Sequence, residues 1–181
     1  MRRLIIRSAA HALALWPDPN APKFFDMDGV LARYNWNAYL TETRPGVKLY
    51  EDERLHYYRC CEPDQTAIAL AKAFHAAGHR VFVLTNVRSS LPWARADKAA
   101  WLEQHMPWLD TATRLIVADG DKAQAAMARS RMAGLKRTMP LFDDFNPNLH
   151  DWEAAGGASV KYLNGVNTPC TGPRLEYDGR V

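Results

Sequence analysis

The sequence predicts an α/β fold in which a mostly parallel, five-stranded sheet lies between two layers of helices. Short apolar runs alternate along the chain with longer segments whose apolar residues recur at helical spacing. The apolar runs are continuous, as is typical of strands that are buried on both faces of a parallel sheet. With 181 residues, 48% of them hydrophobic and 24% charged, the chain has the size and composition of one soluble domain.

The predicted strands and helices follow one another in regular order. The first strand begins at Lys23, is buried, and ends in a turn at Gly29. The other strands are predicted at 81–84, 115–118, 140–142 and 159–163. The intervening helices are predicted at about 63–78, 89–104, 122–132 and 147–155, with glycine, proline or serine near several of their ends.

Three segments lie outside this alternation. Residues 1–22 are expected to form an N-terminal arm and connector, which packs either on the rest of the chain or on a second subunit and is therefore a candidate contact for a homo-oligomer. Residues 23–181 are expected to form a single catalytic domain, in which 33–62 is a short aromatic insertion without a clear period. From about residue 164 the chain is rich in Gly, Pro and Asn, and we expect it to wrap around the surface.

Charge and cysteine content restrict the class of protein. A net charge of +3 without a basic cluster does not indicate a nucleic-acid polymer as partner. No apolar run approaches the roughly 18 residues of a membrane span, and Arg7 and His11 interrupt any signal-peptide core. Three cysteines, Cys60, Cys61 and Cys170, do not make a disulfide framework, so we expect free thiols and a cytoplasmic location.

Polar and charged side chains follow the ends of the predicted strands. In open α/β sheets the ligand crevice lies outside the carboxyl ends of the strands, so these side chains are expected to meet at one edge. They are, in chain order, Asp26, Asp28, Thr85, Asn86, Lys122, Asp143 and Asp144.

Such a group of carboxylates favours a divalent cation and phosphoryl transfer. Carboxylates that lie close together raise each other's pKa unless a positive charge separates them. Oxygen ligands without a His or Cys cluster indicate Mg²⁺, which also binds substrate phosphate. One carboxylate can attack phosphorus, and a second, two residues further on, can act as general acid and base.

The motif 25–31 (FDMDGVL) resembles the first motif of the haloacid-dehalogenase-like phosphohydrolase superfamily. Thr85, Lys122 and the pair at 143–144 resemble its second, third and fourth motifs in the same order, over about residues 23–163. The resemblance implies a Rossmann-type three-layer fold and a phosphatase of small-molecule phosphate monoesters that forms an aspartyl-phosphate.

By this resemblance each motif residue has an expected role. Asp26 is the nucleophile and Asp28 the general acid and base, while Thr85, with Asn86 beside it, and Lys122 bind phosphate. Mg²⁺ is held by the Asp26 carboxylate, the Asp28 carbonyl and Asp144, and Asp143 contacts a water ligand of the ion.

Within the superfamily the sequence is most similar to the deoxyribonucleotidase-like branch and its uncharacterised bacterial and phage relatives. Segments 143–149 and 160–167 resemble those relatives. Tyr34 stands eight residues after the nucleophile, where that branch has an aromatic residue that holds the base; Trp36 is a second candidate for substrate specificity. The insertion is shorter here, which implies a small or absent cap, and nucleoside monophosphates are candidate substrates.

Several alternatives stay open at this point. Lys136 is closer in sequence to the acidic pair than Lys122, and Asp143 and Asp144 are also suited to capping the helix that follows them. The aromatic residues of 34–58 suit either a base-stacking pocket or a small separate core. A phosphotransferase or mutase with the same intermediate, and a non-catalytic metal- or phosphate-binding module, are the alternative functions.

Overall fold

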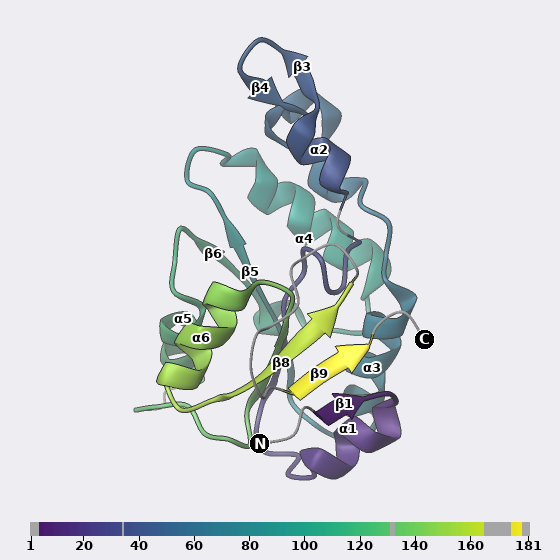
Figure 1. Ribbon diagram of the computed structural model, residues 1–181, viewed down its shortest axis with the longest axis vertical. Coiled ribbons are helices and arrows are strands. Elements are labelled where there is room, and N and C mark those ends of the chain that lie inside the picture. The colour runs from purple at the N-terminus through teal and green to yellow at the C-terminus, as the bar shows by residue number, and fades with distance from the viewer. Residues whose placement is uncertain (1–3, 34, 131–132, 165–174, 179–181) are drawn as a thin grey trace.

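The computed structural model describes residues 4–33, 35–130, 133–164 and 175–178. Within these ranges seven strands form one sheet in the order β1-β9-β8-β7-β2-β5-β6, and every pairing in it is parallel (Figure 1). The strands are β1 (Leu4–Ile6), β2 (Lys23–Phe25), β5 (Val81–Val87), β6 (Arg114–Ala118), β7 (Pro140–Asp143), β8 (Ala158–Leu163) and β9 (Leu175–Asp178).

The α/β class and the parallel sheet are confirmed, but the predicted number of five strands is wrong. The five predicted strands correspond to β2, β5, β6, β7 and β8. The two additional strands, β1 and β9, lie in the segments predicted as an arm and as a surface-wrapping tail. They pair with each other, and β9 also pairs with β8, so the two ends of the chain extend the sheet at one side.

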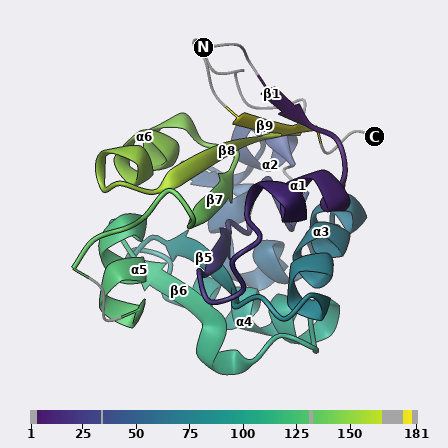
Figure 2. The same cartoon turned by 90° about the horizontal axis from the view of Figure 1, so that it is seen from below.

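Helices cover both faces of the sheet, which gives three layers (Figure 2). On one face lie α1, α3 and α4, and on the other lie α5 and α6. Their bounds are α1 (Ala9–Leu15), α3 (Gln65–Ala76), α4 (Trp93–His105), α5 (Lys122–Ser130) and α6 (Asn146–Ala154). Helix α4 begins later than the predicted residue 89, with Pro92 at its N-cap position.

Two apolar cores form because successive residues of a strand point to opposite faces. Phe25 stacks on Phe142 with ring centroids 4.6 Å apart and belongs to the core under α1, α3 and α4. Its neighbour Phe24 packs against Trp152 of α6, at 4.9 Å between centroids, in the core on the other face. Burial on both faces accounts for the runs of consecutive apolar residues in β2, β5 and β7.

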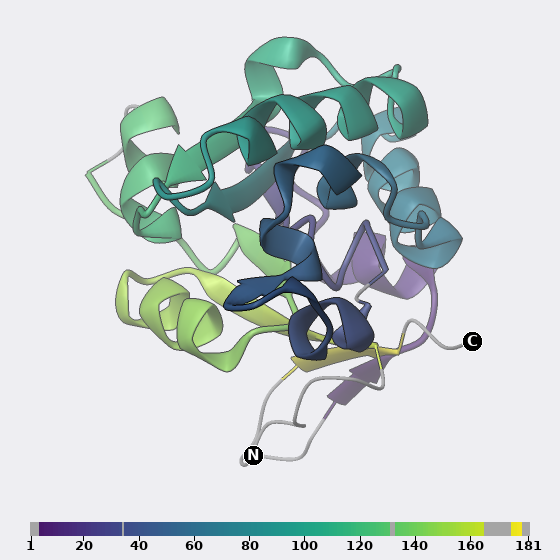
Figure 3. The same ribbon diagram turned by 90° about the horizontal axis from the view of Figure 1, so that it is seen from above.

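Residues 35–62, here called the cap segment, lie beyond the end of the sheet to which the strands point (Figures 1 and 3). The segment contains α2 (Trp36–Leu40), a hairpin of β3 (Glu42–Arg44) and β4 (Val47–Lys48), and the 3₁₀ helices η1 (Leu49–Glu51), η2 (Glu53–Leu55) and η3 (Tyr57–Arg59). Elsewhere, η4 (Thr111–Thr113) precedes β6. Tyr39 stacks on Tyr50, and Tyr57 and Tyr58 pack with Tyr50 against α4, so these tyrosines form a small separate core.

The described cysteines, Cys60 and Cys61, are free thiols, and Cys170 lies outside the described residues. Among the helices that the structure describes, none has both the length and the apolar character needed to cross a lipid bilayer.

Candidate active site

The acidic residues meet where the direction of the sheet topology reverses. From β2 the chain continues to β5 and β6 on one side, and then returns to β7, which pairs with β2 on the other side. The loops that leave β2 and β7 therefore diverge to opposite faces, and a crevice between them is the usual ligand site of such sheets. Asp26 follows β2 directly, and Asp143 and Asp144 stand at the end of β7.

Asp26 is held in place by the strand pairing and by a tight turn after it. Its backbone N–H donates to the Phe142 carbonyl at 2.9 Å, which continues the β2–β7 ladder by one residue. The Met27 N–H donates to Asp26 Oδ1 at 2.7 Å. The turn then reverses at Gly29, whose φ of +80° favours glycine.

Gly29 is also required by the close approach of the two acidic loops. A Cβ at this position would lie 2.1 Å from Asp144 Oδ2. Asn164 Nδ2 connects both sides, since it donates to the Gly29 carbonyl at 2.9 Å and to Asp144 Oδ2 at 2.7 Å. The buried Lys161 of β8 donates to the Asp144 carbonyl, so β8 supports the same loop.

Lys122 lies between the carboxylates of the two strands. Its Nζ is 2.7 Å from Asp26 Oδ1 and 2.7 Å from Asp143 Oδ2, and its side chain is 4% exposed. Asp143 also accepts from the Phe145 N–H at 2.8 Å and from Asn148 Nδ2 at 3.0 Å. Both carboxylates thus share one buried ammonium group, which lowers the cost of placing two negative charges side by side.

The start of α5 explains how Lys122 comes to point inward. Asp121 Oδ1 accepts from the Ala123 and Gln124 N–H groups at 2.7 and 3.2 Å, so Asp121 caps the helix. Lys122 is therefore the first residue of α5. A cation in the first turn opposes the helix dipole, but its two carboxylate partners outweigh that cost. Lys136, the alternative lysine, is exposed, so the structure brings Lys122 and not Lys136 to the acidic residues.

Asp28 and Thr85 are joined by a lysine of α4. Lys98 Nζ donates to Asp28 Oδ2 at 2.6 Å and to Thr85 Oγ1 at 2.8 Å. Thr85 is buried, and its successor Asn86 points to the other face of the sheet, where its Nδ2 donates to the Gly120 carbonyl at 3.1 Å. Burial raises the pKa of Asp28 above its usual range, and the Lys98 ammonium partly opposes that increase.

The geometry fits a divalent cation. Asp26, Asp143 and Asp144 each offer an oxygen, and these atoms lie within 4.8 Å of one another. Burial, with the charges of Asp26 and Asp143, raises the pKa of Asp144 to about 8, and burial raises the pKa of Asp143 to about 6. These carboxylates are costly to ionise without further positive charge, and a hard cation with oxygen ligands supplies it.

The formal charge of the site changes sign when such an ion binds. Among the described residues of this edge, four carboxyl groups face three buried lysines, which leaves one negative charge when all seven groups are ionised: Asp26, Asp28, Asp143, Asp144, Lys98, Lys122 and Lys161. A divalent cation turns this into one positive charge. With such an ion the site would carry a net positive charge and would favour anionic ligands.

Two predicted specificity residues are not tested by the structure. Tyr34 lies outside the described residues, and Trp36 begins α2, but its side chain is not among those described. Their roles therefore stay predictions.

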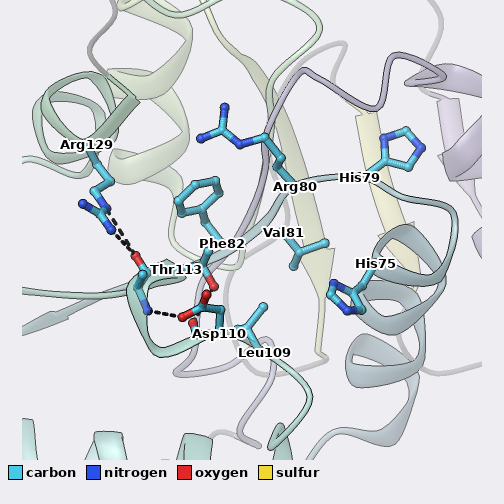
Figure 4. A pocket seen from close by; sticks show the side chains of 10 residues that line it. His75, His79, Arg80, Val81, Phe82, Leu109, Asp110, Thr113 and Arg129 are labelled. Carbon is cyan, nitrogen blue, oxygen red and sulfur yellow. Dashed lines mark hydrogen bonds between the residues drawn. The ribbon is translucent and has the colours of Figure 1, made fainter.

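A separate cavity of about 460 Å³ lies at the opposite edge of the sheet, near the amino end of β5 (Figure 4). Its lining includes His75, Arg80, Asp110 and Arg129, and Arg129 donates to the Ala112 carbonyl. None of its lining residues belongs to the acidic site, so this cavity is distinct from the candidate active site.

Sequence reasoning missed three side chains of the site, Lys98, Lys161 and Asn164. Lys98 lies on the buried face of α4 with Ala94 and Trp101, four residues before it and three after it. A lysine among the apolar residues on one face of a predicted helix indicates a buried lysine with a charged partner. Lys161 gave the same indication, because it lies within the buried strand β8. Asn164 had no such signal, because it follows the strand in a polar loop.

Comparison of the chain with models of known protein families gives no match, and comparison with curated proteins gives none either. The function of the chain is therefore inferred from the residues and geometry of the site itself.

The raised pKa of Asp144 predicts how stability depends on pH. An unfolded Asp titrates near pH 4, so between about pH 4 and 8 the folded, metal-free chain binds more protons than the unfolded chain. The contribution of Asp144 protonation to the stability of the folded chain is therefore complete below pH 4 and is lost as the pH rises towards 8. We expect the melting temperature in EDTA to fall over this range, and Asp144→Asn to raise it at pH 8. If Asp144→Asn removes about 2 kcal/mol of the cost of ionising this buried carboxyl group, the melting temperature rises by roughly 4–8 °C.

Mg²⁺ should reverse this trend, because it binds the ionised carboxylates. Excess Mg²⁺ is expected to raise the melting temperature of the wild type more at pH 8 than at pH 5, and to leave Asp144→Asn almost unchanged. Thermal unfolding with EDTA or Mg²⁺ at both pH values measures this. An equal Mg²⁺ effect in wild type and variant would show that Asp144 is not a ligand.

Proposed function

We propose that this chain is a magnesium-dependent phosphatase of small-molecule phosphate monoesters, and that it acts through an aspartyl-phosphate on Asp26. The observation that carries the proposal is the buried group of Asp26, Asp143 and Asp144 at the point where the sheet topology reverses, with the Lys122 ammonium between Asp26 and Asp143. The order of the motifs and the parallel α/β sheet support membership of the haloacid-dehalogenase-like superfamily, with the small cap segment in place of a large helical cap.

In this proposal the reaction has two steps, in which Asp26 is the nucleophile and Asp28 the general acid and then the general base. Asp26 Oδ attacks phosphorus, and the bond from phosphorus to the leaving oxygen breaks while protonated Asp28 gives its proton to that oxygen. Asp28, now a carboxylate, takes a proton from water as the water oxygen attacks phosphorus. The bond between Asp26 and phosphorus breaks, so inorganic phosphate leaves and both carboxyl groups return to their starting states.

The surroundings of each residue suit these steps. Asp28 is 29% exposed in its side chain and Asp26 only 7%, so Asp28 is the more accessible to a leaving group and to water. Lys122 would bind the phosphoryl oxygens beside the nucleophile, and its two carboxylate partners raise its pKa, so that it stays charged. Mg²⁺, held by Asp26, Asp144 and the Asp28 carbonyl with support from Asp143, would neutralise charge that develops on the phosphoryl group.

The test is release of phosphate from p-nitrophenyl phosphate by the purified chain. We expect turnover with Mg²⁺, a loss of at least about 100-fold in EDTA, and recovery when Mg²⁺ is restored. Equal rates in EDTA and Mg²⁺ would contradict the proposal. Binding of Mg²⁺ without turnover would indicate a binding module, and transfer of phosphate to added glycerol in preference to water would indicate a phosphotransferase.

A panel of nucleoside monophosphates and sugar phosphates then defines the substrate. We propose nucleoside monophosphates as the preferred class, on the sequence resemblance around Tyr34. Tyr34→Ala should reduce that preference, and equal kcat/KM across the panel would remove the nucleotide proposal while leaving the phosphatase proposal intact.

A further inference from the structure

Lys98 is buried, and among the described residues its ammonium group hydrogen-bonds only to residues of the candidate site. Its side chain is 1% exposed, and its Nζ donates to Asp28 Oδ2 at 2.6 Å, Thr85 Oγ1 at 2.8 Å and the Asn86 carbonyl at 2.6 Å. An ammonium group has three donors, and these three acceptors use them all. The ring of Tyr58 in η3 lies 4.9 Å from the same nitrogen, which adds a cation–π contact from the cap segment.

Packing alone does not explain a lysine at this position. Its nearest neighbours along the same face of α4, Ala94, Trp101 and Leu102, are apolar, and an apolar side chain would fill the space without the cost of removing a charge from water. The other buried charged residue of the helix, Asp97, pairs with His56 and Arg59 of the cap segment. The ammonium instead connects the turn after β2 to the end of β5, since Asp28 belongs to the first and Thr85 to the second. The lysine therefore determines where the Asp28 carboxyl group stands relative to a residue expected to bind phosphate.

We propose that Lys98 is a positioning residue that holds the carboxyl group of Asp28 beside Thr85, and so directs the Asp28 proton to the leaving oxygen of the substrate. This proposal depends on the function proposed above. It adds to that function a residue from α4 that belongs to none of the sequence motifs. Tyr58 and the Asn86 carbonyl fix Lys98 in turn, so the cap segment and β5 both contribute to the position of the acid.

The leaving group of the substrate separates this role from a purely structural one. p-Nitrophenolate leaves without needing a proton, whereas an alkoxide must be protonated as it leaves. Because kcat/KM reports the steps up to departure of the leaving group, it isolates the acid step from the later hydrolysis of the aspartyl-phosphate. A loss of acid positioning must therefore affect an alkyl phosphate more than p-nitrophenyl phosphate.

The experiment measures kcat/KM for p-nitrophenyl phosphate and an alkyl phosphate in Lys98→Met and Lys98→Arg. For Lys98→Met we expect a loss of about 100-fold or more on the alkyl ester and less than about 5-fold on the aryl ester. Lys98→Arg keeps the charge but changes the contact geometry, so it should show a smaller loss in the same direction. In an Asp28→Asn background, where the rate of the single-turnover release of the leaving group is measured instead, Lys98→Met should change the ratio of the two esters no further.

The control is Lys23→Met, which removes a buried lysine at the amino end of β2. Lys23 donates to the backbone carbonyls of Asp18 and Ala21, far from the acidic edge, so its loss should leave the ester ratio unchanged. Equal losses on both esters in Lys98→Met, or no loss, would overturn the proposal; if Lys98→Met does not fold, the ratio in Lys98→Arg decides. A wild type that hydrolyses neither ester would instead overturn the proposed function.

Discussion

Asp26→Asn is expected to lower kcat for p-nitrophenyl phosphate by at least about 10⁴-fold, because an amide is a very poor nucleophile toward phosphorus. The substitution keeps the shape of the side chain, and the Asn oxygen can still accept from the Met27 N–H and Lys122. Lys122 also retains Asp143 as its partner at 2.7 Å. The variant should therefore fold, and the loss should appear in kcat and not in the amount of folded protein.

Asp110→Asn is the matched control for this change. Asp110 caps η4 at the opposite edge of the sheet, so the same chemical substitution there should change kcat by less than about 3-fold. The two variants and the wild type are purified in the same way and compared for phosphate release and for melting temperature. More than about 1% of wild-type activity in Asp26→Asn would exclude Asp26 as the nucleophile.

Lys122→Met should have the second largest effect, on both stability and activity. The substitution leaves Asp26 and Asp143 buried side by side without their shared ammonium, and breaking a buried ion pair in this way costs about 3–5 kcal/mol. For a domain of this size that corresponds to a fall in melting temperature of roughly 6–20 °C in EDTA. We expect kcat/KM with Mg²⁺ to fall on the order of 10³-fold, because the transition state loses a cation that is in place before the reaction.

Lys136→Met distinguishes this explanation from the alternative lysine. Lys136 is exposed, so its substitution should change neither the melting temperature by more than about 2 °C nor kcat/KM by more than about 3-fold. Thermal unfolding and steady-state kinetics on both variants give the comparison. Loss of activity in Lys136→Met with normal activity in Lys122→Met would show that Lys136, and not Lys122, binds the phosphate.

Strands β2, β5, β6 and β7 were predictable because each contains a run of consecutive apolar residues that ends at a polar or charged residue. Those ends place Asp26 and Asp143 at one edge, and the structure brings them within reach of the same lysine. The outer strands β1 and β9 were not predictable in the same way. Each is only three or four residues long, and each is stabilised by pairing with a segment from the other end of the chain.

The parts of the site that the sequence concealed share a physical cause. Lys98 and Lys161 are lysines, which are usually exposed, and their burial depends on partners that are distant in sequence. Lys98 meets Asp28 across 70 residues of chain, so no local pattern predicts that contact. The helices and strands of the cap segment could not be predicted from the sequence, because each of them has only two to five residues and is too short to show a period.

The central claim is that Asp26 carries the phosphoryl group during turnover. Its most direct test is mass spectrometry of the Asp26 peptide after acid quenching of Asp28→Asn with p-nitrophenyl phosphate and Mg²⁺, since this variant lacks the base that hydrolyses the intermediate. We predict a phosphoryl group on Asp26 and a burst of about one p-nitrophenolate per chain. Continued hydrolysis without any phosphorylated Asp26 peptide, or phosphorylation of a different residue, would contradict the mechanism.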